Sequence, residues 1–599
     1  MIPSREQSQA RMDLIAQGQA MHTPEQTFTI ADRFEQLAAE DGDRVFLIDG
    51  EREVSFAQLN SQANRYAYLA RQLGLETGDT GAVMMQNRPE FFFAWVGLAK
   101  AGITAVMVNS YSKGKALAHA LNITNSQLLY VGQECLENFD GQSGLLGERP
   151  SLVIEDGIDC ALPATARWIS PLVKALPDDN PPRQWREGII GKMPAFHCFT
   201  SGTTGLPKAA IISHARWLSV GTGWNKLLGI TRDDVFYCIL PLFHGAAGMS
   251  LTSNAVGAGA RMVLRRKFSA SEFWNDVRRH GITTTQYIGE ITRYLVNRPA
   301  CDNDRDHSLK HMTGAGMTAD VWQKFVDRFG GINIYEGLGA TESNCGISNV
   351  DGRIGSIGRI PFKEKSNARV VKYNVEDDCH LRDENDHLIE IKAGEVGELI
   401  GMILELPGVM GGRFEGYTDP QASEAKVLRN VFRDGDAWFS TGDLVTCDEE
   451  DYFYFVDRIG DTFRWKSENV STTEATEALA PFDDAEIINI YGVRVPDYEG
   501  RAGMAAIQMK DGRAFDPDLF YRIATEQLPH YAVPLFLRVS SQSDLTPTFK
   551  LRKVDLQKQG YDPNCFSDPL YLLNHRDNTY SPYSEPGLVQ LDVAPFETN

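Results

Sequence analysis

Short apolar runs alternate with amphipathic stretches along most of the chain. Runs typical of buried strands occur at Gly81–Met85, Ile103–Val108, Leu128–Val131, Ala209–Ile212 and Val235–Leu240. Apolar residues at helical spacing lie between such runs, as at Phe56–Leu73 and Glu272–His280. Strands that alternate with helices form parallel sheets with helices on their faces. The pattern therefore predicts an α/β fold with mostly parallel sheets.

The most apolar stretch, Phe91–Val108, is long enough to be considered as a membrane span. Lys100 interrupts its middle, and a glycine lies on either side of this lysine. We therefore predict a core helix over Pro89–Lys100, a turn at Ala101–Gly102 and a buried strand at Ile103–Val108. The sequence predicts no transmembrane segment.

The chain has 599 residues, more than a single domain usually holds. The basic and polar segment Arg464–Ser471 precedes a region with its own strand and helix patterns, at Glu486–Val493, Gly503–Met509 and Pro517–Leu528. We predict a large α/β domain over residues 1–457 and a smaller α+β domain over residues 458–599. Pro171–Arg186 is rich in Pro and Asp and is predicted to be an exposed loop.

The composition of the chain limits which partners it can bind and which cellular compartment suits it. Lys and Arg number 59 and Asp and Glu 80, which gives a net charge of −21 at pH 7. A nucleic-acid-binding protein needs a basic face, so we exclude that partner, and the charge disfavours docking on anionic membrane. The 9 cysteines form no closely spaced motif, and the N-terminus has no apolar signal sequence. We therefore expect a reducing, cytoplasmic location.

The strongest local signal is the segment Phe199–Lys208, FTSGTTGLPK, which we call the phosphate segment. Its glycines allow backbone N–H groups to turn toward an anion, and Lys208 adds a positive charge. It differs from the Walker pattern, because proline precedes the lysine and alanine follows it. The residues predicted to hold a polyphosphate are Thr200, Ser201, Gly202, Thr203, Thr204, Gly205 and Lys208. The alternative is a Ser/Thr/Gly turn without a function.

Two acidic positions suit the rest of a nucleotide site. Glu342 is a carboxylate that can hold Mg²⁺ against phosphate oxygens, and its neighbour Thr341 can donate to a phosphoryl oxygen. Asp443 lies on a glycine-containing turn and can accept both ribose hydroxyls, which Arg458 can also reach. The alternatives are a solvated loop acid for Glu342, an Asx turn for Asp443 and a surface ion pair for Arg458.

The phosphate segment resembles that of the adenylate-forming superfamily, and further motifs of this family follow in order. They are Tyr335–Glu342, Ser440–Asp443, Asp457–Asp461 and Thr548–Lys550. Other stretches resemble the fatty acid transport protein branch, the very-long-chain acyl-CoA synthetases. These stretches are Tyr287–Leu295, Gly416–Asp419, Phe463–Val470 and Asp568–Tyr571. The resemblance covers nearly the whole chain after about residue 28.

The resemblance implies the fold of the acyl-CoA synthetases and a reaction in two halves. A carboxylate attacks ATP to give acyl-AMP and pyrophosphate, and CoA then displaces AMP to give acyl-CoA. ATP, Mg²⁺ and CoA are thus the expected ligands. Lys550 is implied as the catalytic lysine, carried by a mobile C-terminal domain. The adenine would lie against Gly314, Ala315, Gly316 and Tyr335.

The resemblance also assigns residues to the acid, the hinge and the CoA tunnel. His244 would gate the acyl pocket, and Tyr287 and Gly289 would form its wall; ordinary core is the alternative for all three. Gly460 is the implied hinge, where the family often has Asp or Lys. Ser467, Glu468 and Asn469 would line the CoA tunnel, although the branch usually has glycine at the serine position. Animal members carry an N-terminal membrane anchor, which we do not expect here.

Several functions remain open on the sequence. The preferred reading is a ligase for long- or very-long-chain fatty acids, cytoplasmic or peripheral at the inner face of the membrane. The acid could instead be a steroid or bile-acid side chain or a short polar acid, or the acyl group could pass to a carrier-protein thiol. A fatty-acid uptake protein without catalysis is disfavoured, because pure binding does not need Lys208, Glu342, Asp443 and Lys550 together.

Overall fold

The computed structural model describes the chain except for residues 1, 140–143, 146–148, 158–160, 164–165, 201–205, 376–378, 466–467, 497, 499, 541–552, 592 and 594–599. Its contacts divide the chain into two compact units. The first comprises Met1–Ala368 and Gly401–Ser440, and the second comprises Arg369–Ile400 and Thr441–Asn599. The predicted domain boundary after Asp457 stays a prediction.

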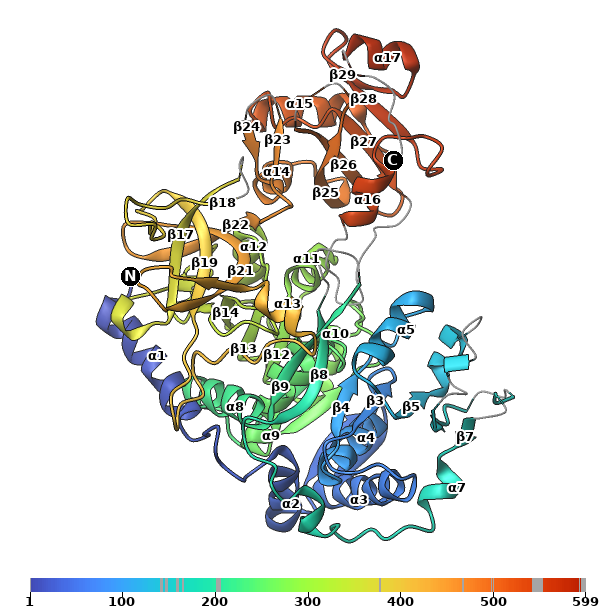
Figure 1. Ribbon diagram of the computed structural model, residues 1–599. Helices are drawn as coiled ribbons and strands as arrows, with labels where there is room; N and C mark the ends of the chain where they lie inside the picture. The colour runs from blue at the N-terminus through green and yellow to red at the C-terminus, as the bar shows by residue number, and fades with distance from the viewer. Residues whose placement is uncertain are drawn as a thin grey trace. The chain divides into compact units, whose positions relative to one another are not determined.

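The first unit contains two large sheets (Figure 1). One has the order β15-β14-β13-β12-β10-β11-β1-β2, and all its inner pairs are parallel. Only its edge strands β2 and β15 pair antiparallel, so the prediction of mostly parallel sheets is confirmed here. The strands are β1 (Val45–Asp49), β2 (Arg52–Ser55), β10 (Val235–Cys238), β11 (Arg261–Leu264), β12 (Thr284–Ile288), β13 (His311–Ala315), β14 (Asn333–Leu338) and β15 (Ile347–Ser348).

The other sheet has the order β7-β6-β5-β3-β4-β8-β9. It is parallel except for the hairpin of β8 and β9, which positions the phosphate segment. The strands are β3 (Thr80–Met84), β4 (Thr104–Met107), β5 (Leu128–Gly132), β6 (Ser151–Ile154), β7 (Ala166–Trp168), β8 (Pro194–Thr200) and β9 (Lys208–Ser213).

Helices cover both sheets, and buried aromatic rings join the layers. The α-helices of this unit are α1 (Arg5–Gln19), α2 (Ile30–Asp41), α3 (Phe56–Gln72), α4 (Pro89–Lys100), α5 (Gly114–Ile123), α7 (Ser170–Val173), α8 (His214–Leu228), α9 (Thr252–Ala258), α10 (Phe273–His280), α11 (Gly289–Asn297), α12 (Ala319–Phe329) and α13 (Pro420–Glu424). Helix α4 packs on β3 and β4. Its Trp95 meets Trp217 of α8 and Phe196 of β8 edge-on, each at 5.5 Å between ring centroids.

The helix predicted over Pro89–Lys100 is confirmed, and it lies in the core. Lys100 is fully buried, and its ammonium lies 2.9 Å from the Glu35 carboxylate. Burial lowers the pKa of Lys100 to about 8, against the opposing effect of Glu35. Among the described residues, no helix is both long and apolar enough to cross a membrane.

The predicted exposed loop over Pro171–Arg186 is wrong at both ends. Helix α7 begins at Ser170, and a 3₁₀ turn closes the segment at Arg186. Arg186 is 5% exposed and lies 3.2 Å from the carboxylate of Asp32. Pairing with carboxylates of α2 buries this guanidinium, although Pro and Asp dominate the local sequence.

The second unit contains an antiparallel region that the prediction of parallel sheets missed. Strands β22 and β21 pair antiparallel, as do β17 and β18. The strands here are β17 (Ala368–Asn374), β18 (Cys379–His380), β19 (Val396–Met402), β21 (Ala437–Cys447) and β22 (Tyr452–Arg458). The first residue of β17, the end of β19 and the start of β21 belong to the first unit, where β20 (Val427–Arg429) pairs with Ala437–Phe439.

The C-terminal part of the second unit is α+β, as predicted. Its sheet has the order β25-β26-β27-β28-β29, and the hairpin β23-β24 lies outside it. The strands are β23 (Phe463–Trp465), β24 (Glu468–Val470), β25 (Ala485–Arg494), β26 (Arg501–Met509), β27 (Phe536–Ser540), β28 (Leu570–Asn574) and β29 (Thr579–Pro582). The helices are α14 (Thr472–Ala478), α15 (Pro517–Gln527), α16 (Val554–Gln559) and α17 (Glu585–Gln590). Buried residues from all of these helices and from most of these strands form one hydrophobic core.

Candidate active site

The phosphate segment starts in the last two residues of β8, Phe199 and Thr200, and it reaches Lys208 where β9 begins. Thr200 and Lys208 face each other in the antiparallel register. Because β8 also pairs in parallel with β4, Thr200 lies at the carboxyl edge of the sheet, where open α/β sheets bind their ligands. Ser201, Gly202, Thr203, Thr204 and Gly205 lie outside the described residues, so their phosphate contacts stay predictions.

Tyr417 joins three of the predicted residues, and sequence reasoning missed it. Its hydroxyl donates to Glu342 Oε1 at 3.0 Å, and the Lys208 ammonium lies 5.6 Å from its ring centroid. Burial and the Glu342 carboxylate raise the pKa of Tyr417, while a hydrogen bond from Thr200 acts in the opposite direction. An antiparallel bridge between Ala210 and Tyr417 fixes the tyrosine beside β9. The family-like stretch Gly416–Asp419 was its only sequence signal.

The second oxygen of Glu342 is free to bind a cation. Glu342 Oε2 is buried and has no hydrogen-bond partner in the described part of the chain. A buried carboxylate oxygen with an unused lone pair is costly unless a donor or a hard cation completes it. Mg²⁺ is typically held by one or two carboxylates together with substrate phosphates. Glu342 therefore fits the predicted metal.

Thr341 and His244 are brought together at Gly245, the residue that follows His244. The Thr341 side chain packs directly on Gly245, where a Cβ would lie 2.5 Å from Thr341 Oγ1. His244 is half-buried and caps the next helical segment, Gly245–Leu251, by accepting the Ala246 N–H at its Nδ1 at 3.2 Å. The structure therefore brings the predicted gate residue beside the residue predicted to meet phosphate.

The predicted adenine segment, Gly314–Met317, lies against the predicted pocket wall. Strands β12 and β13 are parallel neighbours, and Tyr287 faces Gly314 in their register. A Cβ on Gly289 would lie 1.8 Å from the Gly316 carbonyl oxygen, and Gly316 has a φ of +86°. Both glycines are therefore required for this close approach of two backbones.

Glu336 holds the adenine segment in place and was also missed. This side chain is 3% exposed, and it accepts the hydroxyl of Tyr287 and the backbone N–H of Gly316. Burial raises the pKa of Glu336 to about 7, against the effect of these hydrogen bonds. Tyr335, the neighbouring residue on β14, has its ring centroid 6.2 Å from that of Trp224. The alternation along a strand thus turns Tyr335 away from the face that Glu336 occupies.

In the second unit, the two residues predicted to hold the ribose are paired with each other. Asp443 and Arg458 face one another across β21 and β22, and Arg458 Nε lies 3.0 Å from Asp443 Oδ1. Asp443 is buried, whereas half of the arginine side chain is exposed. The preceding Gly442 has a φ of +80°, and its N–H donates to Glu398 at 2.8 Å.

The predicted hinge lies in a tight turn next to a buried carboxylate. Gly460 has a φ of +93°, and the Asp461 N–H donates to the Arg458 carbonyl at 3.0 Å. Asp457 is 2% exposed and accepts the backbone N–H of Thr472 at 2.7 Å, which ties the turn to α14. Of the other predicted residues, Lys550 and Ser467 lie outside the described residues, and Glu468 and Asn469 are described only as backbone of β24.

Comparisons with known proteins identify the family of the chain. The family model of the AMP-binding enzymes matches residues 34–412. The chain belongs to this family. It is 39% identical over 572 residues to long-chain fatty acid transport protein 2 of Rattus norvegicus, across 93% of this chain and 89% of the relative. It is 36% identical over 566 residues to a medium/long-chain-fatty-acid–CoA ligase of Mycobacterium tuberculosis, across 94% of this chain and 90% of that enzyme.

The fold has solved relatives as well. The crystal structure of an anthranilate CoA ligase in complex with anthranoyl-AMP matches with a TM-score of 0.73 at 20% identity, over 88% of this chain and 96% of that one. Its fold is that of the adenylate-forming superfamily, which confirms the fold class. Within this superfamily the chain is an acyl-CoA synthetase of the fatty acid transport protein branch, an AMP-forming acid–CoA ligase. Ligases of this family use ATP and CoA.

Proposed function

We propose that this synthetase activates a long- or very-long-chain fatty acid through acyl-AMP to acyl-CoA. The observation that carries the proposal is the Tyr417 cluster, in which Thr200, Lys208 and Glu342 meet at one edge of the sheet. Such a set of donors, a cation and an open carboxylate oxygen suits a magnesium polyphosphate. The names of the relatives from rat and from Mycobacterium tuberculosis support a fatty acid as the carboxylate.

In the first half-reaction, the protein positions reactants and stabilises charge. A fatty-acid carboxylate is ionised near pH 7, so its attack on the α-phosphorus needs no general base. Lys208 and the hydroxyls of the phosphate segment hold the β- and γ-phosphates, and Thr341 donates to a phosphoryl oxygen. Lys550 bridges the carboxylate and the α-phosphoryl oxygens, where negative charge develops.

The remaining roles complete the nucleotide and metal sites. Gly314, Ala315 and Gly316 receive the adenine on a backbone that Glu336 holds, and Asp443 with Arg458 binds the ribose. Glu342 would hold Mg²⁺, which would supply neutralising charge at the phosphate oxygens. The backbone of Tyr335 lies beside Thr313 on β13, next to the adenine segment, while its ring packs with Trp224.

The second half-reaction uses a rotation of the C-terminal domain, residues 458–599, about Gly460. This rotation withdraws Lys550 and brings Ser467, Glu468 and Asn469 to the CoA thiol. The thiolate attacks the acyl carbonyl, and AMP leaves. A glycine in the left-handed region gives the chain the conformational freedom that such a hinge needs. His244, Tyr287 and Gly289 border the acyl group.

The substrate class is tested by a panel of carboxylic acids. Purified protein is incubated with ATP, Mg²⁺, CoA and one acid at a time, and AMP release is measured. We expect the highest kcat/KM with fatty acids of long or very long chain. A preference for a steroid side chain or a short polar acid would contradict the substrate. Pyrophosphate release without thioester formation from free CoA would instead indicate a carrier-protein acceptor.

We also propose that the protein works in the cytoplasm, with peripheral contact at the inner face of the membrane. The cysteine pattern suits a reducing compartment. A long acyl chain partitions into membrane, so an enzyme that uses it gains from working at that surface.

A further inference from the structure

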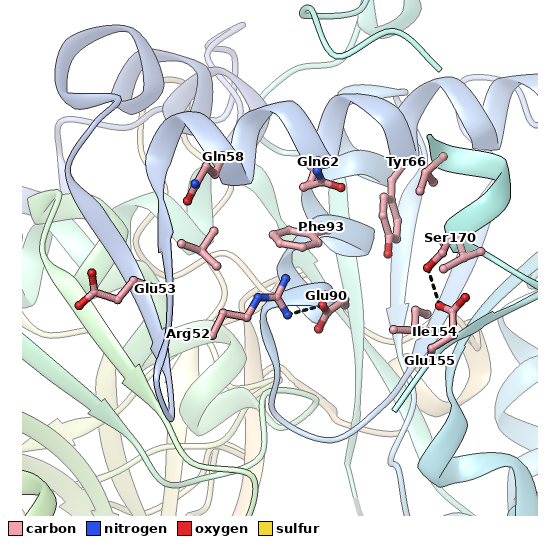
Figure 2. Close-up of a pocket in the computed structure, with 13 residues that line it drawn as sticks. Arg52, Glu53, Gln58, Gln62, Tyr66, Glu90, Phe93, Ile154, Glu155 and Ser170 are labelled. Carbon is pink, nitrogen blue, oxygen red and sulfur yellow. Dashed lines mark hydrogen bonds and ion pairs between the residues drawn. The ribbon is translucent and has the colours of Figure 1, made fainter. Parts of the chain in front are cut away.

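A cavity of about 450 Å³ lies on the first unit, apart from every residue assigned above to ATP, the acid or CoA. It is bounded by β2, α3, α4, the end of β6 and α7 (Figure 2). Its volume is within the range of small-molecule sites. Glu155 at its rim follows β6, which is four strand spacings from β8 in a parallel sheet, or ~19 Å at ~4.8 Å each. The cavity is therefore separate from the phosphate segment.

An unpartnered hydroxyl points into this cavity. Tyr66 extends from α3 toward Ile154 and Glu155 in Figure 2, and the residue is only 3% exposed. Its hydroxyl makes no hydrogen bond to any residue that the structure describes. Burial, followed by the nearby Glu90 charge, raises the pKa of Tyr66 well above its usual value, so the phenol stays neutral. The hydroxyl faces the cavity, so a ligand there could give it the hydrogen-bond partner that the protein does not supply.

Carboxylates outnumber cations on the lining. Glu90 already pairs with Arg52 at 2.6 Å and with Arg88 at 2.8 Å, whereas Glu53 and Glu155 form no ion pair with any described residue. Ser170 donates to the Glu155 carboxylate at 2.8 Å, which leaves the other oxygen of that carboxylate available. The electrostatic field of the cavity therefore favours a cation over an anion.

The protein already places a cation of its own here. The Arg52 guanidinium lies 5.9 Å from the centroid of the Phe93 ring and 2.6 Å from the Glu90 carboxylate. Half of the Arg52 side chain is exposed, so it can swing outward at little cost. Once Arg52 moves away, the Phe93 ring is left as an apolar surface, and the carboxylates nearby suit a positively charged group.

We propose that this cavity is an accessory binding site for a small organic cation, an amine that carries an apolar group. The ammonium would lie between Glu155 and the Tyr66 hydroxyl, which accepts one of its N–H groups. The apolar group would lie against the ring of Phe93. Arg52 covers the Phe93 ring that the apolar group would use, and its charge opposes a second cation, so it acts as an internal occupant of the site.

Titration calorimetry of the full chain with phenethylamine tests this site, with 2-phenylethanol as the neutral analogue. We expect one molecule of the amine to bind per chain, more weakly at high salt and unchanged by saturating ATP, and the alcohol not to bind. Tyr66→Phe and Glu155→Gln should each weaken binding about tenfold. Arg52→Gln should strengthen binding about threefold, because it removes the competing guanidinium.

Tyr68→Phe is the matched control, since Tyr68 lies on the same helix but packs on Trp185, with 5.1 Å between centroids. Its affinity should equal that of the unmodified chain, and thermal melting verifies that each variant is folded. No binding of the amine, equal binding of the alcohol, competition by ATP, or unchanged affinity in both weakening variants would each overturn the proposal.

Discussion

At the residue scale, the candidate site depends on two side chains that hold others in place. Tyr417 orients one oxygen of Glu342 and leaves the other oxygen open. Glu336 accepts a backbone N–H of the adenine segment while buried beside Tyr287. Neither side chain needs to touch a substrate, so each acts through the residue that it positions.

Tyr417→Phe should lower kcat/KM for adenylation about tenfold. The variant removes a hydrogen bond to a charged group, which is worth ~1.5–3 kcal/mol, and frees Glu342 to rotate. The apparent KM for Mg²⁺ should rise, whereas the KM for the fatty acid should not change. Tyr521→Phe is the control, because that hydroxyl meets His575 at 3.1 Å and Asn578 at 3.2 Å on the second unit. An unchanged magnesium dependence would refute the positioning role.

Glu336→Gln should flatten the pH dependence of stability. The pKa of Glu336 rises from 4.5 to about 7 on folding. The folded state therefore prefers the protonated acid, and this contribution is present below pH 4.5 and is lost as the pH rises through 7. Glutamine stays neutral and does not lose this contribution. From pH 4.5 to pH 8, the free energy of unfolding of the variant should therefore rise, relative to that of the unmodified protein, by on the order of 3 kcal/mol.

Denaturant titrations of both proteins at several pH values measure this difference. The contributions of the other titratable groups are the same in both proteins and cancel. Parallel stability curves would show that Glu336 keeps an ordinary pKa when folded.

At the element scale, the ends of adjacent parallel strands create the adenine segment. Strand β12 ends beside β13, and α11 begins at Gly289 directly below the Gly316 carbonyl. Strand β14, the neighbour of β13 on the side away from β12, supplies Glu336. The geometry of this region is therefore set by the packing of whole strands.

Gly289→Ala should raise the KM for ATP at least tenfold and lower stability by ~1–3 kcal/mol. The new Cβ would lie 1.8 Å from the Gly316 oxygen, so the two backbones must separate. Steady-state kinetics and denaturant unfolding measure the two effects. Gly411→Ala is the matched control, because nothing lies within 4 Å of the Cβ position there. Equal KM values for the two variants would argue against the close approach.

At the scale of the whole molecule, one lysine and one hinge should separate the two half-reactions. Lys550→Ala should lower adenylation by about 10²–10³-fold, as the loss of a preorganised charge donor does. It should spare thioester formation from supplied acyl-AMP. Lys558→Ala, an exposed lysine on α16, is the control. Equal loss in both half-reactions would contradict the assignment.

Gly460→Pro should uncouple the half-reactions and lower overall turnover. Proline fixes φ near −65°, whereas Gly460 has a φ of +93°, so the chain can no longer adopt this turn. Rates of pyrophosphate release and of thioester formation, measured separately, identify the affected half. Gly512→Pro changes another glycine in an open turn, with a φ of +76°, and should leave both rates unchanged. Normal turnover of the hinge variant would exclude Gly460 as the hinge.

Much of the fold could be predicted from the sequence, because each helix or strand is encoded by a short continuous segment. The predicted strands at Leu128–Val131 and Ala209–Ile212 appear within a residue or two as β5 and β9, and the helix at Pro517–Leu528 appears as α15. Apolar periodicity sets these elements without reference to distant residues. The motif order predicted the family for the same reason, since each motif is a short continuous segment.

Only the tertiary structure decided which side chains meet. Tyr417 reaches Glu342 across 75 positions of sequence, and Arg186 finds carboxylates of α2 across 154. Tyr335 and Glu336 are neighbours on β14, yet Glu336 holds the adenine segment and Tyr335 packs with Trp224. The sequence by itself determined elements, family and candidate chemistry. Contacts, burial and shifted pKa values arise from packing between distant segments, which no local pattern encodes.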